Sequence, residues 1–259
     1  MPSESLKDIT WIVVDLETTG LKPWEGDKIC EIAALRVKNE KIIDEFQSLV
    51  NPERHIPPDA QAIHGISNEQ VKNAPAIEHL LQKFRQFSEK GIIAGYNIEF
   101  DLEFINSELK TIGETRIFIK DSLDVWGLAR RLLHLPHYKL SDVAQALHIA
   151  PPEHRALSEC KATWQVLKRL LEMSNSATSD ELRTTIRSEN PYKNLIDTIG
   201  NTIKNKQQFH LRYQASNQES TDRTITPIDY GDQHLVAYCH LRKAERNFRF
   251  DRIKSLQAT

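Results

Sequence analysis

The fold is decided by the stretch Trp11-Ile-Val-Val-Asp15-Leu-Glu17-Thr-Thr-Gly-Leu21, in which four apolar residues run directly into two acids. A continuous apolar run of this kind predicts a buried strand, here Trp11–Val14. Side chains alternate along a strand, so Asp15 and Glu17 point the same way from its carboxyl end. Two acids that face one way off a core strand repel each other unless a cation lies between them. The stretch indicates a cation site, although solvated surface is the alternative for each acid alone.

Strand and helix patterns alternate after this stretch. Ile29–Val37 and Lys41–Val50 are strand-like and are joined across three polar residues, which predicts an antiparallel meander of three strands. Further expected elements are a helix over 77–87, a strand over 91–95, a helix over Glu99–Leu109, a strand over Arg116–Ile119, and helices over Val125–Leu133, Ser141–His148 and about Ala156–Met173. We therefore expect the α/β class with a mixed sheet and flanking helices.

The sequence predicts two domains, 1–173 and 191–259, joined by a polar linker over 174–190. The second begins with a helix that carries Leu195, Ile196, Ile199 and Ile203. Strands are expected at Phe209–Gln214, Thr224–Ile228, His234–His240 and Phe248–Asp251, which together predict one helix and a small β-barrel or sheet.

Composition limits the class of protein. The 259 residues are 39% hydrophobic and 27% charged with a net charge of −2, which excludes a membrane protein and a disordered chain. Residues 191–259 carry 11 Lys and Arg against 7 Asp and Glu, a net of +4. The start lacks the basic-then-apolar order of a secretory signal, and three scattered cysteines indicate neither a disulfide framework nor a zinc ribbon. We expect a cytoplasmic location with no membrane contact.

Two later segments carry further acids and a histidine. Asp101 follows Gly95-Tyr-Asn97-Ile-Glu-Phe100 at a loop-to-helix junction, where an acid could simply cap the helix. His154 follows a double proline, and Glu159 comes five residues later. Five helical residues leave two side chains out of register, so these two share a site only if His154 lies in the loop and Glu159 one turn into the helix.

Taken together, five blocks appear in order: Val-Val-Asp15-Leu-Glu17-Thr-Thr-Gly-Leu, Ile-His64-Gly-Ile-Ser, Tyr-Asn97-Ile-Glu-Phe-Asp101, Leu-Ala-Arg-Arg-Leu, and His154-Arg-Ala-Leu-Ser-Glu159-Cys-Lys-Ala-Thr. This series resembles the DEDDh (DnaQ-like) exonuclease family, the proofreading-subunit-like nucleases with a ribonuclease H-like fold. The resemblance covers about Thr10 to Leu171.

The resemblance implies roles for five residues. Asp15, Glu17, Asp101 and Glu159 match the family's metal ligands, which hold two Mg²⁺ or Mn²⁺ ions, and His154 matches its general base. The family normally has Asp where this chain has Glu159, and because Mg²⁺ demands near-ideal octahedral geometry, the choice between Mg²⁺ and Mn²⁺ stays open.

The resemblance also implies a substrate wall. Residues at the positions of Thr18, His64, Asn97 and Phe100 border the terminal nucleotide in the family. Loop packing is the alternative for His64. Tyr96 stands where the family commonly has His, and we interpret it as a packing residue. Asp124 matches a recurrent family acid that we interpret as structural, while His134 and His137 are expected at a loop surface.

The C-terminal stretch from His234 to Ile253 resembles a WYL domain, a small Sm-like or SH3-like β-barrel, although the Trp-Tyr-Leu signature is replaced by His234-Leu-Val236. Arg242, Arg246, Arg249 and Arg252 are candidate substrate-binding residues. They interleave with Phe248 and Phe250, a pattern suited to phosphate contact plus base stacking. A solvated strand face is the alternative.

These expectations converge on a divalent-metal-dependent 3′–5′ exonuclease that releases nucleoside 5′-monophosphates, with a C-terminal domain that binds nucleic acid or regulates. Single-stranded DNA is the favoured partner. An RNA-trimming exoribonuclease is the alternative within the enzyme class. A nucleic-acid-binding sensor, catalytically weakened by Glu159, is the alternative from another class.

Overall fold

The computed structural model describes residues 5–182, 190–215 and 219–259, and these residues form two compact units. The first unit contains 5–117 and 121–182, and the second contains 118–120 together with the described residues from 190 onward. Residues 118–120 belong to the second unit because the backbone amides of Ile119 and Lys120 donate hydrogen bonds to the fully buried carboxylate of Asp229.

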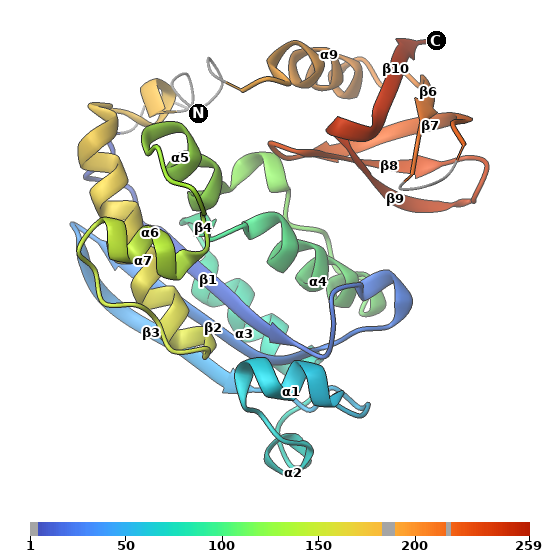
Figure 1. Cartoon of the computed structure of the whole chain (residues 1–259). Coiled ribbons are helices and arrows are strands. Elements are labelled where there is room, and N and C mark those ends of the chain that lie inside the picture. Colours follow the sequence, from blue (N-terminus) through green and yellow to red (C-terminus); the bar gives the residue numbers. More distant parts are fainter. Residues whose placement is uncertain (1–4, 183–189, 216–218) are drawn as a thin grey trace. The chain divides into compact units, whose positions relative to one another are not determined.

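A five-stranded mixed sheet forms the centre of the first unit (Figure 1). Its strands are β1 Trp11–Thr18, β2 Ile29–Lys38, β3 Lys41–Leu49, β4 Ile92–Gly95 and β5 Leu123–Asp124, in the order β3-β2-β1-β4-β5. The pairs β1/β2 and β2/β3 are antiparallel, and β1/β4 and β4/β5 are parallel. The predicted meander and the α/β class are confirmed. Strand β1 lies between two neighbours, which explains its continuous apolar run.

Helices flank this sheet in Figure 1. They are α1 Pro58–His64, α2 Asn68–Val71, α3 Ile77–Ser88, α4 Ile98–Thr111, α5 Val125–Leu132, α6 Leu140–Ala146 and α7 Ala156–Ser174, with short 3₁₀ turns at Pro23–Glu25 and Ile119–Asp121. Helix α7 packs against β1 and β2. Trp11 and Val13 share one buried cluster with residues of α5, α6 and α7, so α7 covers the face of the sheet to which these odd-numbered residues of β1 point.

The strand expected over Arg116–Ile119 is wrong. The backbone of Ile117 is instead held by the side chain of Asn106, which accepts from its amide at 2.7 Å and donates to its carbonyl at 2.9 Å. Ladder hydrogen bonds to β4 are made further along, where Leu123 pairs with Ala94 and Asp124 with Gly95. A two-residue strand carries too little pattern to be found from sequence.

The second unit contains a helix and an all-antiparallel sheet, consistent with a small barrel-like domain. Helix α9 is Lys193–Lys204, and the strands are β6 Phe209–Tyr213, β7 Thr221–Tyr230, β8 His234–Cys239, β9 Ala244–Arg249 and β10 Ile253–Ala258, in the order β10-β6-β7-β8-β9. Strand β10, whose residues are half-buried or exposed, was not predicted from the sequence. The strand predicted over Phe248–Asp251 runs past the end of β9 into a 3₁₀ turn at Phe250–Arg252. Ile199, Phe209, Ile225 and Phe248 lie in its core.

The predicted linker over 174–190 lies partly outside the described residues. In the part that is described, Ala177 accepts a hydrogen bond from the amide of Leu6 at 3.0 Å, and Leu182 is buried in the cluster beneath α7. This first part of the predicted linker therefore packs onto the first unit.

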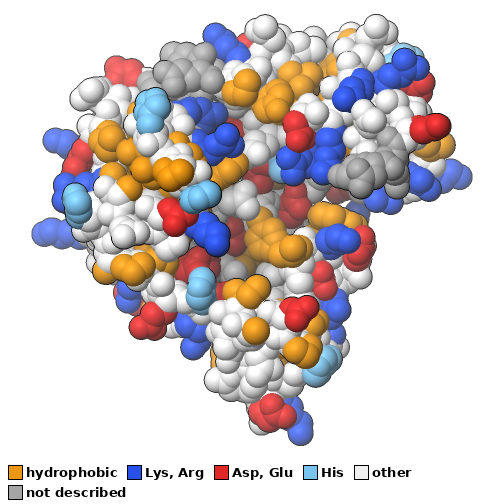
Figure 2. All heavy atoms as spheres, in the orientation of Figure 1, with side chains coloured by type: hydrophobic (Ala, Val, Ile, Leu, Met, Phe, Trp, Pro, Cys, Tyr) orange, Lys and Arg blue, Asp and Glu red, His pale blue; other side chains and the backbone are white. Residues whose placement is uncertain are grey.

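Two surface properties bear on function. Acidic and basic side chains are interspersed over the face seen in Figure 2. Among the described residues, we find no helix whose length and apolarity would let it cross a membrane.

Candidate active site

Strand β1 positions the first two acids. Asp15 and Glu17 have the same parity as Trp11 and Val13, so they point to the face that α7 covers. Asp15 lies opposite Ala33 of β2 and is only 9% exposed, and Glu17 lies opposite Glu31. The alternation predicted from sequence therefore places both carboxylates beside the start of α7.

Helix α4 brings Asp101 to this strand. The helix begins after Asn97, a residue with a left-handed backbone (φ 63°), whose amide donates to Oδ1 of Asp124 at 2.9 Å. Asp124 also caps α5 by accepting from the amides of Trp126 and Gly127, so the structural role expected for it fits. Asp101 follows in the first turn of α4, is 3% exposed, and accepts a hydrogen bond from the backbone of Leu16 in β1.

Helix α7 supplies the last acid and the histidine. It begins at Ala156, so Glu159 lies in its first turn and His154 in the preceding loop, as their spacing requires for a shared site. Nδ1 of His154 lies 3.4 Å from Oε1 of Glu159. The His154 side chain is 71% exposed, whereas that of Glu159 is 23% exposed. The imidazole therefore has access to solvent while contacting the acid.

Electrostatics show that the four acids form one cluster. Burial raises the pKa of Asp15, and the charges of Asp101, Glu159 and Glu17 raise it further. Burial, followed by the charge of Glu159, raises the pKa of Glu17 to about 8. Burial is also the main cause of the raised pKa of Asp101 and of Glu159, the latter opposed by His154. Each carboxylate is thus less stable as an anion here than in water.

Such a donor set suits a hard divalent cation. Mg²⁺ and Mn²⁺ take carboxylate oxygens, and bound cations offset the mutual repulsion that raises these pKa values. Within the described ranges, no three His, Cys, Asp or Glu side chains are close enough together to coordinate one metal ion in their present conformations. A cation would therefore have to draw the carboxylates together. The chemistry of the donor set fits the group that the sequence implies.

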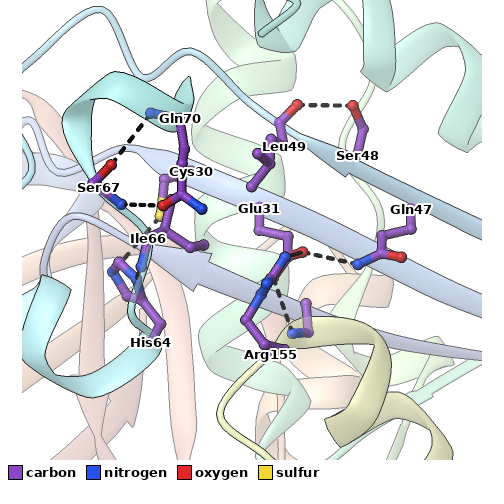
Figure 3. Close-up of polar contacts among 11 residues, drawn as sticks. Cys30, Glu31, Gln47, Ser48, Leu49, His64, Ile66, Ser67, Gln70 and Arg155 are labelled. Carbon is purple, nitrogen blue, oxygen red and sulfur yellow. Dashed lines mark hydrogen bonds and ion pairs between the residues drawn. The ribbon is translucent and has the colours of Figure 1, made fainter. Parts of the chain in front are cut away.

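A fifth acid beside this cluster was missed by sequence reasoning. Glu31 is 0% exposed and lies on β2 directly opposite Glu17. Burial raises its pKa, but hydrogen bonds from Arg155, Gln47 and the amide of Ala156 outweigh burial and hold the pKa of Glu31 below its usual value. Figure 3 shows its carboxylate between Arg155 and Gln47. The available signal was a lone acid in the apolar run Ile29–Val37.

The residues expected to border the terminal nucleotide differ in how exposed they are. Asn97 is exposed, and its side chain makes no capping hydrogen bond, while Phe100 is half-buried with its ring 5.0 Å from that of Phe104. Thr18 is 9% exposed, and its hydroxyl donates to the carbonyl of Gly20 at 2.6 Å. Asn97 and Phe100 are thus more open to a ligand than Thr18.

His64 is buried at 4% exposure (Figure 3). Its Nδ1 accepts from the amide of Ile66 at 3.0 Å, and its Nε2 lies 3.8 Å from Sγ of Cys30. Burial lowers the pKa of His64. These contacts favour the loop-packing interpretation that the sequence left open. Tyr96 likewise packs against the core and donates to the carbonyl of Tyr138 at 2.8 Å, as expected of a packing residue.

The C-terminal arginines do not form one stripe. Arg246 pairs with Ala237 and Arg249 with His234 along β8, positions of opposite parity, so the two arginines point to opposite faces of the sheet. Arg249 forms a two-point ion pair with Asp251 at 3.0 and 2.8 Å. Arg242 is exposed and Arg252 is half-buried.

The aromatic residues between these arginines belong to the core. Phe248 and Phe250 are 1% and 3% exposed, so their rings are not available for base stacking. The sequence alternation that suggested stacking arises around Arg249, whose outward-facing side chain lies between the inward-facing rings of Phe248 and Phe250. The exposed arginines can still contact phosphates, which was the other half of the expectation.

Comparisons with known proteins decide the family. Residues 12–167 match the family described as exonuclease (RNase_T). The chain belongs to this exonuclease family. Residues 194–258 match the WYL domain, so a WYL domain follows the exonuclease domain.

Relatives of this exonuclease-family chain include the DNA polymerase III PolC-type protein of Thermotoga petrophila, which is 33% identical over 216 residues. That match covers 83% of this chain but only 15% of the relative, so the chain spans a small part of the curated relatives it matches.

Solved structures agree with the fold. Exonuclease X in complex with 5′ overhanging duplex DNA has a TM-score of 0.53 and 25% identity, covering 66% of this chain and 98% of that chain. Escherichia coli Exonuclease I in complex with a dA16 oligonucleotide has a TM-score of 0.59 and 16% identity, covering 90% of this chain and 55% of that chain. At 16% identity, this second likeness shows the fold alone.

Proposed function

We propose that the chain is a divalent-metal-dependent 3′–5′ exonuclease that releases nucleoside 5′-monophosphates from nucleic acid, with single-stranded DNA as its main substrate. The observation that carries the proposal is a cluster of four carboxylates, two of them buried (Asp15 and Asp101) and two half-buried (Glu17 and Glu159), beside an exposed histidine that contacts Glu159. Membership in the exonuclease family supports the reaction class.

Asp15, Glu17, Asp101 and Glu159 would hold two Mg²⁺ or Mn²⁺ ions. When bound, such a pair stabilises negative charge on the attacking and leaving oxygens of a phosphodiester and lowers the pKa of the attacking water. The protein's part is to hold four carboxylates on rigid elements close enough for their charges to interact: two on β1, one in the first turn of α4 and one in the first turn of α7.

His154 serves as the general base in this proposal. In the neutral tautomer whose Nδ1–H donates a hydrogen bond to Glu159, Nε2 carries the free lone pair, and this nitrogen accepts a proton from the attacking water. Exposure of the ring lets it meet water and substrate, while its contact with Glu159 fixes the tautomer.

Nucleic acid is the proposed partner. Exonuclease X, which is 25% identical to this chain, was solved with 5′ overhanging duplex DNA, and this supports DNA as the substrate class. Asn97 and Phe100 are the members of the expected wall that are open enough to border a terminal nucleotide. We also propose that the exposed arginines of the WYL domain contact phosphates.

A substrate panel tests this function. DNA and RNA oligomers of the same sequence, single-stranded or with recessed ends, are incubated with Mg²⁺ or Mn²⁺, and released nucleotides are identified by chromatography. The proposal predicts nucleoside 5′-monophosphates, fastest from single-stranded DNA, and no release in EDTA. Faster release from RNA would favour the exoribonuclease alternative. Tight binding without release from any oligomer would favour the sensor alternative.

A further inference from the structure

Glu31 is a buried carboxylate whose acceptor positions are all used inside the protein. Oε1 accepts from Nη2 of Arg155 and, at 2.9 Å, from Nε2 of Gln47, while Oε2 accepts from Nε of Arg155 at 3.0 Å and from the amide of Ala156 at 3.1 Å. Figure 3 shows this arrangement at the edge of α7. Two-point pairing with a guanidinium fixes orientation as well as charge.

This arrangement separates Glu31 from the other acids of the site. Asp15, Glu17, Asp101 and Glu159 have raised pKa values, which indicates that the protein alone does not balance their charge. Glu31 is balanced by Arg155 and by two further donors. It is therefore a structural ion-pair partner rather than another metal ligand, although it lies opposite Glu17 in the sheet.

The groups that Glu31 holds lie between His154 and Glu159 in the chain. Arg155 is the residue next to His154, and Ala156 is the first residue of α7, whose amide has no partner within the helix. The carbonyl of Arg155 in turn accepts from the amide of Glu159 at 3.0 Å, which starts the helix. Glu31 on β2 thus fixes Arg155 and Ala156. These two residues connect His154 to the helix that carries Glu159.

We infer that Glu31 and Arg155 are positioning residues that hold His154 and Glu159 beside the carboxylates of β1. His154 is largely exposed, so few of its own contacts restrain its loop. The contacts of Glu31 with the Arg155 side chain and the Ala156 amide, which we call the anchor, link that loop to the sheet. The inference rests on the proposed function for its catalytic consequence, but the anchoring itself can be measured without activity.

Kinetics of Arg155→Met and His154→Ala, singly and together, test the catalytic consequence. Arg155→Met should lower kcat about 10- to 100-fold with little change in KM, because a small displacement of a catalytic group from its productive position has effects of this size. Arg155→Lys keeps the charge but loses the two-point geometry and should fall between wild type and Arg155→Met. In the His154→Ala background, Arg155→Met should cost much less than in the wild type.

Lys161→Met is the matched control. Lys161 also joins α7 to the sheet, through a 3.0 Å ion pair with Glu45 of β3, but both partners in this pair are exposed, at 46% and 42%. This variant should keep wild-type kcat. An equal loss from Arg155→Met with and without His154, or wild-type kcat in both Arg155 variants, would overturn the inference.

Hydrogen exchange of the segment 153–160 supplies a readout that needs no turnover. Arg155→Met should speed amide exchange there relative to wild type and to Lys161→Met, and Arg155→Lys should speed it less. Exchange that is unchanged in Arg155→Met would overturn the anchor. If the wild type hydrolyses no oligomer but Arg155→Met speeds exchange, the proposed function fails while the anchor stands.

Discussion

Nδ1 of His154 lies 3.4 Å from Oε1 of Glu159, although the histidine belongs to a loop and the glutamate to the first turn of α7. This contact links the proposed base to a proposed metal ligand. The acid can orient the imidazole by accepting a hydrogen bond from Nδ1–H, and the histidine in turn opposes the rise in the pKa of Glu159 that burial causes.

Replacing the histidine tests its role as base. His154→Ala should lower kcat about 10²- to 10⁴-fold, the usual contribution of a general base, while the protein remains folded because the side chain is largely exposed. His137→Ala, at an exposed loop position, is the control and should keep wild-type activity. Comparable activities in steady-state assays of the two variants would remove His154 from the mechanism.

The extra methylene of Glu159 should affect the choice of metal. A longer arm relaxes geometric demand, so the wild type should work better with Mn²⁺ than with Mg²⁺, and Glu159→Asp should stay active while its preference shifts toward Mg²⁺. Rates measured with each ion over a range of concentrations give the comparison. Identical Mn²⁺/Mg²⁺ rate ratios in the two proteins would mean that the longer side chain has no effect on metal preference.

Sequence patterns predicted the parts of this site that depend on local chemistry. The apolar run before Asp15 and the alternation to Glu17 predicted a strand with two carboxylates on one face, although β1 continues through both acids to Thr18. The spacing of His154 and Glu159 set the condition that the first lie in a loop and the second one turn into a helix, and the structure meets it. These features follow from periodicity and chain stiffness, which are local properties.

Long-range partners could not be predicted in the same way. Glu31 and Arg155 are 124 residues apart, and an acid in a strand gives no sign of which cation it meets. The segment over Arg116–Ile119 has strand-like residues, but Asn106 supplies the hydrogen bonds of Ile117 and the strand does not form. The sequence suggests that Phe248 is a stacking ring because arginines lie beside it. The strand register, which the sequence does not show, places Phe248 in the core.

Thermal stability without metal should depend on pH through the acidic cluster. The pKa of Glu17 is raised from an ordinary value of 4.5 to about 8, so between these values the folded protein holds a proton that the unfolded chain has released. Stability in EDTA should therefore be greatest near the lower value and fall as pH rises toward 8. The raised pKa values of Asp15, Asp101 and Glu159 act in the same direction.

Melting curves at pH 6 and pH 8 measure this effect. Mn²⁺ should raise Tm more at pH 8 than at pH 6, because the ion binds the deprotonated acids. Glu17→Gln, which cannot ionise, should show a smaller fall in Tm between the two pH values in EDTA. A metal-free Tm that rises from pH 6 to pH 8 would contradict the electrostatic account of the cluster.

The arginines of the WYL domain should contribute unequally to nucleic-acid binding. Each phosphate neutralised on a single strand adds about −0.7 to the slope of log K against log salt. In an Asp15→Asn background that prevents cleavage, Arg246→Gln should flatten the slope by about that amount, whereas Arg249→Gln should do less because Asp251 already pairs with Arg249.

Binding isotherms at several salt concentrations provide the comparison, with Arg212→Gln as a control that breaks another two-point ion pair of the same domain. Slopes that match the parent in both the Arg246 and Arg249 variants would mean that these side chains make no phosphate contact, and would favour a small-ligand or protein-docking role for the domain.

The most direct test of the account compares wild type with Asp15→Asn on a 5′-end-labelled single-stranded DNA in Mn²⁺, followed over time on a sequencing gel. The account predicts a ladder that shortens from the 3′ end in the wild type, and no cleavage by Asp15→Asn, whose metal-free Tm should be no lower because a repelled charge has been removed. Equal cleavage by the folded variant, or a label released at once as mononucleotide, would contradict it.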